Sequence, residues 1–235
     1  MVDRFTKTVR VIIVGVNEQE RERDILDATA DLLLRVGYNK LTMGDVADAV
    51  ALHRGLVYLR FKSKDELVEA VVLRELDRYA DAWREQVEDD PRGGSVASVY
   101  RAMVHALKAL PLASAIVARD AEVFGKYLRK RPSFFERRPN AMGTSEFLQV
   151  MQDAGTVRRD VDVQAVAFIL DALTPALRST FPGESGQPSS DEVLETLADM
   201  LETLAPAHGG DLETGKAVLL SGLEQARADQ GGQES

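Results

Sequence analysis

The residues best suited to chemistry are hydrogen-bond donors gathered between positions 42 and 64 of the sequence. Arg54 can donate two parallel hydrogen bonds to a guanine, while the Tyr58 hydroxyl and the Lys64 ammonium suit phosphate oxygens. Residues 38–64 hold five Lys or Arg side chains against two Asp. Such donors in a short segment are typical of nucleic-acid binding.

The charge of the chain is unevenly distributed. The net charge is −9 over 235 residues, yet residues 1–64 carry +2 and the remainder carries −11. Because salt screens charges beyond about 8–10 Å, a local basic patch can bind phosphates on an acidic protein. The asymmetry indicates different tasks for the two parts of the chain.

The sequence contains few residue patterns that would indicate a catalytic or metal-binding site. Cysteine is absent, which excludes thiolate nucleophiles and Cys-based metal sites. The three histidines, His53, His105 and His208, are isolated from further ligands at a metal-binding spacing. No Ser/His/Asp set, phosphate loop or pair of carboxylates stands out. We expect no enzyme activity, no metal and no cofactor.

The composition is that of a globular protein, with 45% hydrophobic and 29% charged residues. The longest apolar run, residues 11–16, is too short to span a membrane, and no small-residue cleavage site follows it. We therefore expect a cytoplasmic protein with no membrane partner.

Helical periodicity dominates the chain, and the predicted fold class is all-α. Residues 1–16 show no helical period and are interpreted as an arm or a short strand; Asn17 and Glu20 form a predicted capping box that opens a helix ending at Gly37. Thr42 is the expected N-cap of a second, short helix, and Ser63 that of a long fourth helix reaching about residue 88. A third helix is expected between them, over residues 54–61. Further helices are predicted over 96–109, 112–130, 141–154, 163–180, 190–205 and 212–228.

This pattern predicts an all-α protein with an N-terminal three-helix helix-turn-helix DNA-binding domain followed by a larger helical domain, for which the family resemblance given below implies ligand binding and dimerisation. The predicted segments are an arm (1–17), the helix-turn-helix domain (18–64), the effector and dimerisation domain (65–208) and a C-terminal helical extension and tail (209–235). The spacing of the second and third helices lets the former cross the DNA backbone while the latter lies in the major groove.

The segment also closely resembles a known family. The stretches Ile25-Leu26-Asp27-Ala28, Gly37-Tyr38, Asp45-Val46-Ala47, Gly55-Leu56-Val57-Tyr58 and Phe61-Lys62-Ser63-Lys64-Asp65-Glu66-Leu67 resemble the TetR/AcrR family of bacterial transcriptional regulators. The resemblance covers roughly residues 20–70.

The resemblance implies roles for individual residues. Phosphate contacts are implied for Thr42, Tyr58 and Lys64, and base-facing positions for His53, Arg54, Gly55, Leu56 and Leu59. Arg60 is also counted among the DNA-binding residues. Leu59-Arg60 replaces the family's commoner aromatic or His pair, and Leu59 can meet a thymine methyl. Gly44 stands where some members place a long polar side chain. The alternatives are a solvated basic face and, for Leu52, Leu56 and Leu59, plain core positions.

An effector pocket is implied within the middle helices. Its candidate wall consists of large apolar residues: Tyr79, Trp83, Met103, Leu107, Phe124, Tyr127, Met142, Phe147, Met151 and Phe168. Each of these is equally consistent with an ordinary core, because pockets and cores share this composition. A moderately apolar small molecule is the expected ligand.

A homodimer is expected because one helix-turn-helix reads too few base pairs for specificity, and a palindrome matches two copies. The resemblance implies that helices 163–180 and 190–205 meet their symmetry mates. Their apolar stripes are Val166, Ile169, Leu170, Leu173 and Leu177, then Val193, Leu194, Leu197, Leu201 and Leu204.

The sequence thus predicts a ligand-responsive regulator of transcription, a repressor that binds a palindromic operator in double-stranded DNA and is released by a small-molecule effector. Two alternatives stay open. One is a helical small-molecule-binding protein whose DNA specificity has lapsed, and the other is a helical enzyme with a hidden site.

Overall fold

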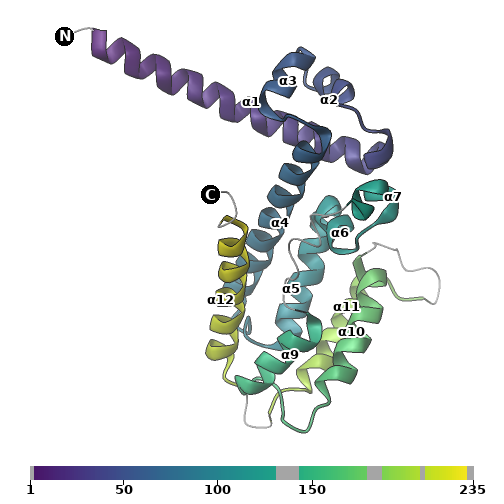
Figure 1. Ribbon diagram of the computed structural model, residues 1–235. Helices are drawn as coiled ribbons and strands as arrows, with labels where there is room; N and C mark the ends of the chain where they lie inside the picture. Colours follow the sequence, from purple (N-terminus) through teal and green to yellow (C-terminus); the bar gives the residue numbers. More distant parts are fainter. Residues whose placement is uncertain (1–2, 131–142, 179–186, 207–209, 232–235) are drawn as a thin grey trace. The chain divides into compact units, whose positions relative to one another are not determined.

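The computed structural model describes residues 3–130, 143–178, 187–206 and 210–231, and the side chains of 3–17 and 226–231 are outside this description. The described residues form helices and their connections, with no β-strand (Figure 1). The all-α prediction is confirmed.

The chain divides into two compact units. The N-terminal unit comprises Met1–Arg74 and Arg119–Arg137, and the C-terminal unit comprises Glu75–Ala118 and Arg138–Ser235. Helix α4 (Lys64–Asp89) contributes its first part to one unit and the rest to the other. Among the described residues, 119–130 are thus grouped with the N-terminal unit.

Helix α1 (Asp3–Lys40) begins far earlier than expected. The prediction of a non-helical arm over residues 1–16, with a helix start at Asn17, is wrong, because the helix runs through this region. Only Gly15 interrupts the Val- and Ile-rich residues there, and one glycine costs a helix about 1 kcal/mol. Gly37, at φ 73° and ψ 162°, breaks the regular helix where the sequence places its end.

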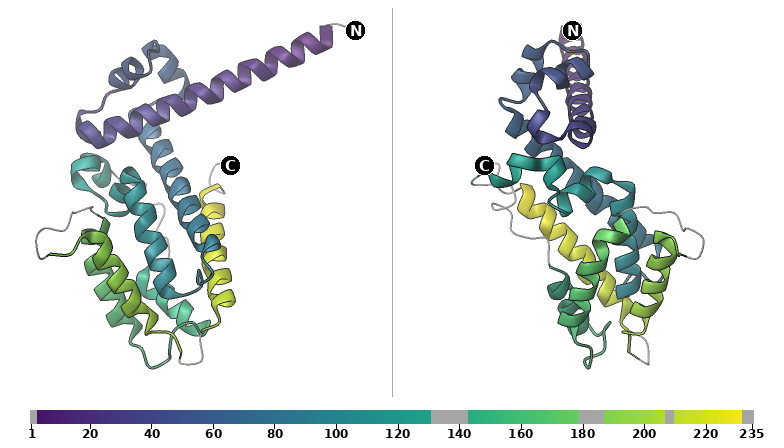
Figure 2. Two further views of the ribbon diagram at one scale, coloured as in Figure 1. Left: turned by 180° about the vertical axis from the view of Figure 1, so that it is seen from behind. Right: turned by 90° about the vertical axis from the view of Figure 1, so that its right-hand side faces the viewer.

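In the described part of the N-terminal unit, the first part of α4 and four further elements complete a buried core. Helices α2 (Met43–Ala49) and α3 (Arg54–Arg60) lie on one side of α1 (Figures 1 and 2). The start of α4 carries the buried Leu67, Val68, Val71 and Val72. Helix α7 (Ala121–Phe124) and the 3-10 helix η1 (Gly125–Arg129) pack against the end of α1, with the rings of Tyr38 and Tyr127 5.3 Å apart.

The prediction of a single helix over residues 112–130 is wrong. The chain instead forms α6 (Pro111–Val117), α7 and η1, with breaks at Arg119 (φ 49°) and Gly125 (φ 45°). Asp120 restarts the helix because its carboxylate accepts a hydrogen bond from the Glu122 N–H at 2.7 Å.

The C-terminal unit is a layered helical domain around two apolar clusters. Its remaining helices are α5 (Val96–Ala109), α9 (Thr144–Asp153), α10 (Val163–Arg178), α11 (Ser190–Glu202) and α12 (Leu212–Gly231). Helices α10 and α11 lie side by side and pack on α5 (Figure 2). Leu170, Leu177, Leu194 and Leu201 fill the core between them.

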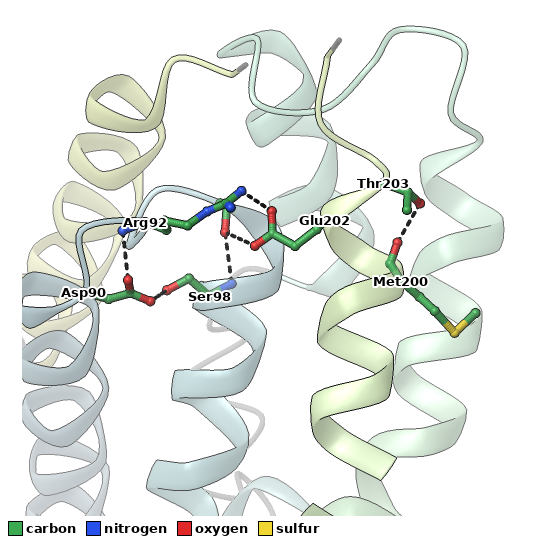
Figure 3. Close-up of polar contacts among 7 residues, drawn as sticks. Asp90, Arg92, Ser98, Met200, Glu202 and Thr203 are labelled. Atoms are coloured by element: carbon green, nitrogen blue, oxygen red, sulfur yellow. Dashed lines mark hydrogen bonds and ion pairs between the residues drawn. The ribbon is translucent and has the colours of Figure 1, made fainter. Parts of the chain in front are cut away.

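The turn between α4 and α5 is fixed by a polar network (Figure 3). Asp90 accepts a hydrogen bond from the Arg92 N–H at 2.8 Å and contacts the Ser98 hydroxyl. Arg92 forms an ion pair with Glu202 at the end of α11, and Ser95 donates to the same carboxylate at 3.2 Å. The network ties this turn to α11, and we assign it a structural role.

Helix α12 packs closely against the turn between α4 and α5, and glycines at the contact make this close approach possible. A Cβ at Gly94 would lie 1.7 Å from the Leu212 carbonyl oxygen, and one at Gly215 would lie 2.5 Å from the Gly94 oxygen. Farther along α12, Leu219 and Leu223 pack with Val87 of α4. The C-terminal helix is therefore part of this unit's core, a role that its sequence alone did not define.

Candidate nucleic-acid interface

Helices α2 and α3 form the predicted helix-turn-helix. Val46 and Ala47 of α2 and Val57 of α3 are buried in the N-terminal unit, which fixes the two helices against each other. Between them, Ala51 adopts a positive φ of 52°, and the Leu52 N–H donates to the Ala47 carbonyl at 2.9 Å. The short turn leaves one face of α3 open to solvent.

The open face of α3 lies opposite Val57. At 100° per residue, Gly55 and Leu59 are centred on this face, with Leu56 and Tyr58 at its edges. Leu59 is 86% exposed and Leu56 48%. They are surface residues, which excludes the alternative that they are core positions; Leu52 is half-buried.

Arg54 and Tyr58 form a pair on one edge of this face. The Arg54 guanidinium donates to the Tyr58 hydroxyl at 3.2 Å and lies 5.4 Å from the centre of its ring. The pairing orients Arg54 without burying it, because both residues are exposed. An oriented guanidinium is suited to the bidentate contact that guanine offers.

Two predicted contact residues act as helix caps. His53 Nδ1 accepts a hydrogen bond from the Gly55 N–H at 3.2 Å and so begins α3, which leaves Nε2 to face outward. Thr42 begins α2, since its hydroxyl accepts from the Asp45 N–H at 3.2 Å and donates to the Asp45 carboxylate at 2.8 Å. The N-cap predicted at Thr42 is confirmed.

Lys64 has an internal role that the sequence did not reveal. Its ammonium donates to the carbonyl oxygens of Tyr38 at 2.8 Å and Leu41 at 3.0 Å, and lies 4.1 Å from the Tyr38 ring centre. Partial burial lowers the pKa of Lys64. Two of its three donors therefore hold the end of α1, and one is left for a phosphate.

Arg60 is likewise engaged within the unit, because it forms an ion pair with Glu22 of α1. This pair joins the end of α3 to α1 and directs the guanidinium away from the centre of the open face. Sequence spacing gave no sign of the pair, since the two residues are 38 positions apart.

A polar cluster beside the helix-turn-helix was also missed. Asp65 at the start of α4 accepts from the Tyr38 hydroxyl and forms an ion pair with Lys130, which follows η1. Partial burial opposes ionisation of Asp65, but the hydrogen bonds from Lys130 and Tyr38 outweigh it and hold the pKa of this carboxyl below its usual value. The cluster fastens residues 119–130 to the DNA-binding helices.

The comparisons with known proteins agree with this geometry. A family model described as "Bacterial regulatory proteins, tetR family" matches residues 25–71. The HTH-type transcriptional repressor KstR2 of Rhodococcus jostii (strain RHA1) is 28% identical over 196 residues, which cover 80% of this chain and 93% of that protein. The HTH-type transcriptional regulator AlkX of Mycobacterium tuberculosis is 39% identical over 57 residues, which cover 24% of this chain and 27% of AlkX.

Residues 25–71 thus match the TetR family, and the similarity to the repressor KstR2 extends over most of the chain. Solved structures show the same fold. PfmR of Thermus thermophilus, a TetR-family regulator, aligns with a TM-score of 0.51 and 20% identity over 76% of this chain and 97% of that one. AibR, solved in complex with isovaleryl coenzyme A and operator DNA, aligns with a TM-score of 0.54 and 19% identity over 77% of this chain and 97% of that one.

The residues predicted to line an effector pocket divide between the two units. Phe124 and Tyr127 are buried in the N-terminal unit, whereas the others that the structure describes belong to the C-terminal unit. Phe168 is 76% exposed on α10, so it faces away from the core that the prediction assigns to it. Met142 lies outside the described residues.

The remaining candidates form part of the helical core. Tyr79 and Trp83 of α4 stack with ring centres 5.7 Å apart, and the Trp83 indole donates to the Val99 carbonyl at 3.1 Å. Leu107 and Met151 are buried, while Met103 and Phe147 are half-buried against the core. Two open grooves of about 390 and 330 Å³ lie elsewhere among the described residues.

Neither metal nor membrane features occur in the described part of the chain. It contains no group of three or more His, Asp or Glu side chains that could hold a metal ion, and His208 lies outside it. None of its helices is long and apolar enough to cross a membrane.

The predicted dimer stripes divide between core and surface. Leu170, Leu177, Leu194, Leu197 and Leu201 are buried within the protomer. A partner cannot contact side chains that are already covered, so these residues are core. Val166, Val193 and Leu204 are half-buried against the same core, and only Ile169 and Leu173 are exposed.

Proposed function

We propose that the protein is a ligand-responsive transcriptional repressor that binds a palindromic operator as a homodimer through α3. The observation that carries this proposal is the open face of α3, where Arg54 and Leu59 are presented to solvent by a helix whose Val57 is anchored in the core. The repressor KstR2, similar over most of its length, supports the direction of regulation. Such a protein works where the DNA is, in the cytoplasm.

A dimer surface is proposed on α10. Besides Ile169 and Leu173, this helix exposes Phe168 and the small residues Ala165, Ala172 and Ala176. Exposed positions 165, 168, 169, 172, 173 and 176 follow the three- and four-residue spacing of a second apolar stripe. Met200 on the neighbouring α11 is 62% exposed and extends this surface.

A second copy of the chain is the occupant that fits this surface. A helix that is apolar on two faces needs two coverings, and the packing of α5, α9 and α11 against α10 leaves this second stripe exposed. A two-fold arrangement also gives two copies of α3, which a palindrome requires.

The effector is proposed to be a small molecule bound by the C-terminal unit. Met103, Phe147 and Trp83 are predicted wall residues that pack against the core of this unit and are only partly buried, so they remain partly accessible to such a ligand. An effector acts by favouring a dimer conformation in which the two α3 helices no longer match half-sites about one helical turn apart.

Selection of bound sequences from a random duplex pool tests the proposal. The full-length protein at physiological salt should enrich a palindrome with two half-sites. A folded, dimeric protein that enriches no sequence contradicts the proposed function. Salt-sensitive binding that is indifferent to sequence would support the alternative of lapsed specificity.

A further inference from the structure

The centre of the open face of α3 is apolar, which is unusual for a surface that meets DNA. Leu59 is the most exposed large hydrophobic side chain in the described part of the chain, at 86%. Leu56, three residues earlier on the same helix, is the neighbour with which it forms a patch. Gly55 adds no side chain beside them.

The polar side chains of α3 flank this patch. Arg54 and Tyr58 pair with each other on one edge. Arg60 on the other edge is held by Glu22 of α1. These hydrogen-bond donors lie at the edges of the face and are paired within the protein. The centre of the open face of α3, which would enter the groove first, therefore presents only leucine methyl groups.

The major groove contains one matching apolar group, the C5 methyl of thymine. Cytosine would instead present an amino donor to a side chain that cannot accept it, and an unpaired buried donor is costly. We propose that Leu59, with Leu56 beside it, reads thymine C5 methyl groups in each operator half-site. This inference rests on the proposed function, since it names the bases that the same face of α3 recognises.

In this proposal, the leucine patch and Arg54 contact different base pairs of a half-site. Cβ atoms three residues apart on a helix are about 5–6 Å from each other, while base pairs rise by about 3.4 Å. The two leucines therefore span neighbouring base pairs. Arg54 lies at the beginning of the same helix and contacts a guanine farther along the groove.

Replacement of thymine by deoxyuridine isolates the methyl group, because uracil keeps every hydrogen-bonding group of thymine. The probe is the duplex selected from the random pool, with each symmetric pair of thymines replaced in turn. Dissociation constants are measured by fluorescence anisotropy for the wild type, for Leu59→Ala and for the matched control Leu34→Ala. Leu34 is an exposed leucine of α1 in the same unit, 42% accessible.

At one pair of positions, deoxyuridine should weaken wild-type binding about 4-fold for each methyl lost, the effect of burying one such group. Leu59→Ala should bind the thymine duplex more weakly and no longer distinguish thymine from uracil there. Leu34→Ala should behave as the wild type does.

Two results would overturn the inference while leaving DNA recognition intact. One is wild-type affinity unchanged on a selected duplex in which every thymine is deoxyuridine. The other is a Leu59→Ala variant that keeps the full sensitivity to the methyl group. Failure to select any sequence would instead refute the proposed function, and this inference with it.

Discussion

The guanidinium of Arg54 donates a hydrogen bond to the hydroxyl of Tyr58 one turn later on α3, at 3.2 Å, and lies above its ring. An arginine on an exposed helix otherwise samples many rotamers, whose loss on binding costs free energy. The pair therefore preorganises the side chain that we expect to read a guanine.

Replacement of Arg54 by Ala tests this reading directly. Loss of a bidentate base contact should weaken operator binding by about 1–3 kcal/mol and relax specificity at one base pair of each half-site. The measurement is a titration against operators that vary at each position. Tyr58→Phe is the matched variant, because it removes only the hydroxyl; we expect it to cost less affinity and to keep the base preference. An equal loss on all DNA sequences after Arg54→Ala would assign this arginine to phosphate.

Lys64 should affect stability more than the salt dependence of binding. Its ammonium holds two backbone carbonyls at the end of α1, and their loss should lower the free energy of unfolding by about 1–3 kcal/mol in Lys64→Ala. Urea denaturation gives this value. The exposed Lys62 is the control, since Lys62→Ala should leave stability nearly unchanged. The competing result concerns the slope of the logarithm of the DNA-binding constant against the logarithm of the salt concentration. If Lys64→Ala reduces the magnitude of this slope by about one and leaves stability unchanged, this lysine neutralises a phosphate instead.

Asp65 should make the N-terminal unit sensitive to acid. Its pKa is lower in the folded protein than its ordinary value, so its stabilising effect is complete above about pH 4 and is lost as the pH falls through the folded pKa. Because Asp65 and Lys130 are each 44% exposed, Asp65→Asn should cost only about 0.5–1 kcal/mol at pH 7.

This cost should shrink as the pH falls through the folded pKa and the wild-type carboxyl becomes protonated. Urea titrations of both proteins over a series of pH values from 7 downward give the comparison. A difference that is the same at every pH would mean that the charge of Asp65 contributes nothing.

The proposed dimer surface predicts different effects for a charge at an exposed leucine of α10 and at a buried leucine of α11. Leu173→Glu places a charge on the exposed face, so it should give a folded monomer by light scattering, with unchanged helical content by circular dichroism. Leu197→Glu buries a charge in the core and should unfold the protomer. A Leu173→Glu protein that remains fully dimeric would place the interface elsewhere.

The close approach of α12 to the α4–α5 turn should not tolerate a side chain. A Cβ at Gly94 would meet backbone at 1.7 Å, so Gly94→Ala should lower the melting temperature by several degrees. Gly143 is the matched control, because a Cβ there has nothing within 4 Å. Equal melting temperatures for Gly94→Ala and the wild type would show that α12 docks differently.

The helix-turn-helix could be predicted from sequence because its signals are local. Thr42 caps α2 within three residues, and the Val46 and Val57 positions follow from helical spacing. The breaks at Arg119 and Gly125 could not be predicted in the same way. They depend on packing against α1, where residues almost 90 positions apart in the chain meet.

The contacts made by individual polar residues also could not be predicted from the sequence. Whether Lys64 or Arg60 faces DNA depends on partners far away in the chain, Tyr38 and Glu22, that no periodicity reveals. For α10, a signal was present. Phe168, Ile169 and Leu173 complete a second apolar stripe, and a helix that is apolar on both faces predicts a second covering.

The most direct test of the central claim, that α3 reads a specific operator, is a ratio of two affinities. The full-length protein is titrated at 0.15 M salt against the selected palindrome and against the same base pairs in shuffled order. We predict that the palindrome binds about 10³-fold more tightly or better, as specific DNA readers do. Equal affinity for both duplexes would contradict the account.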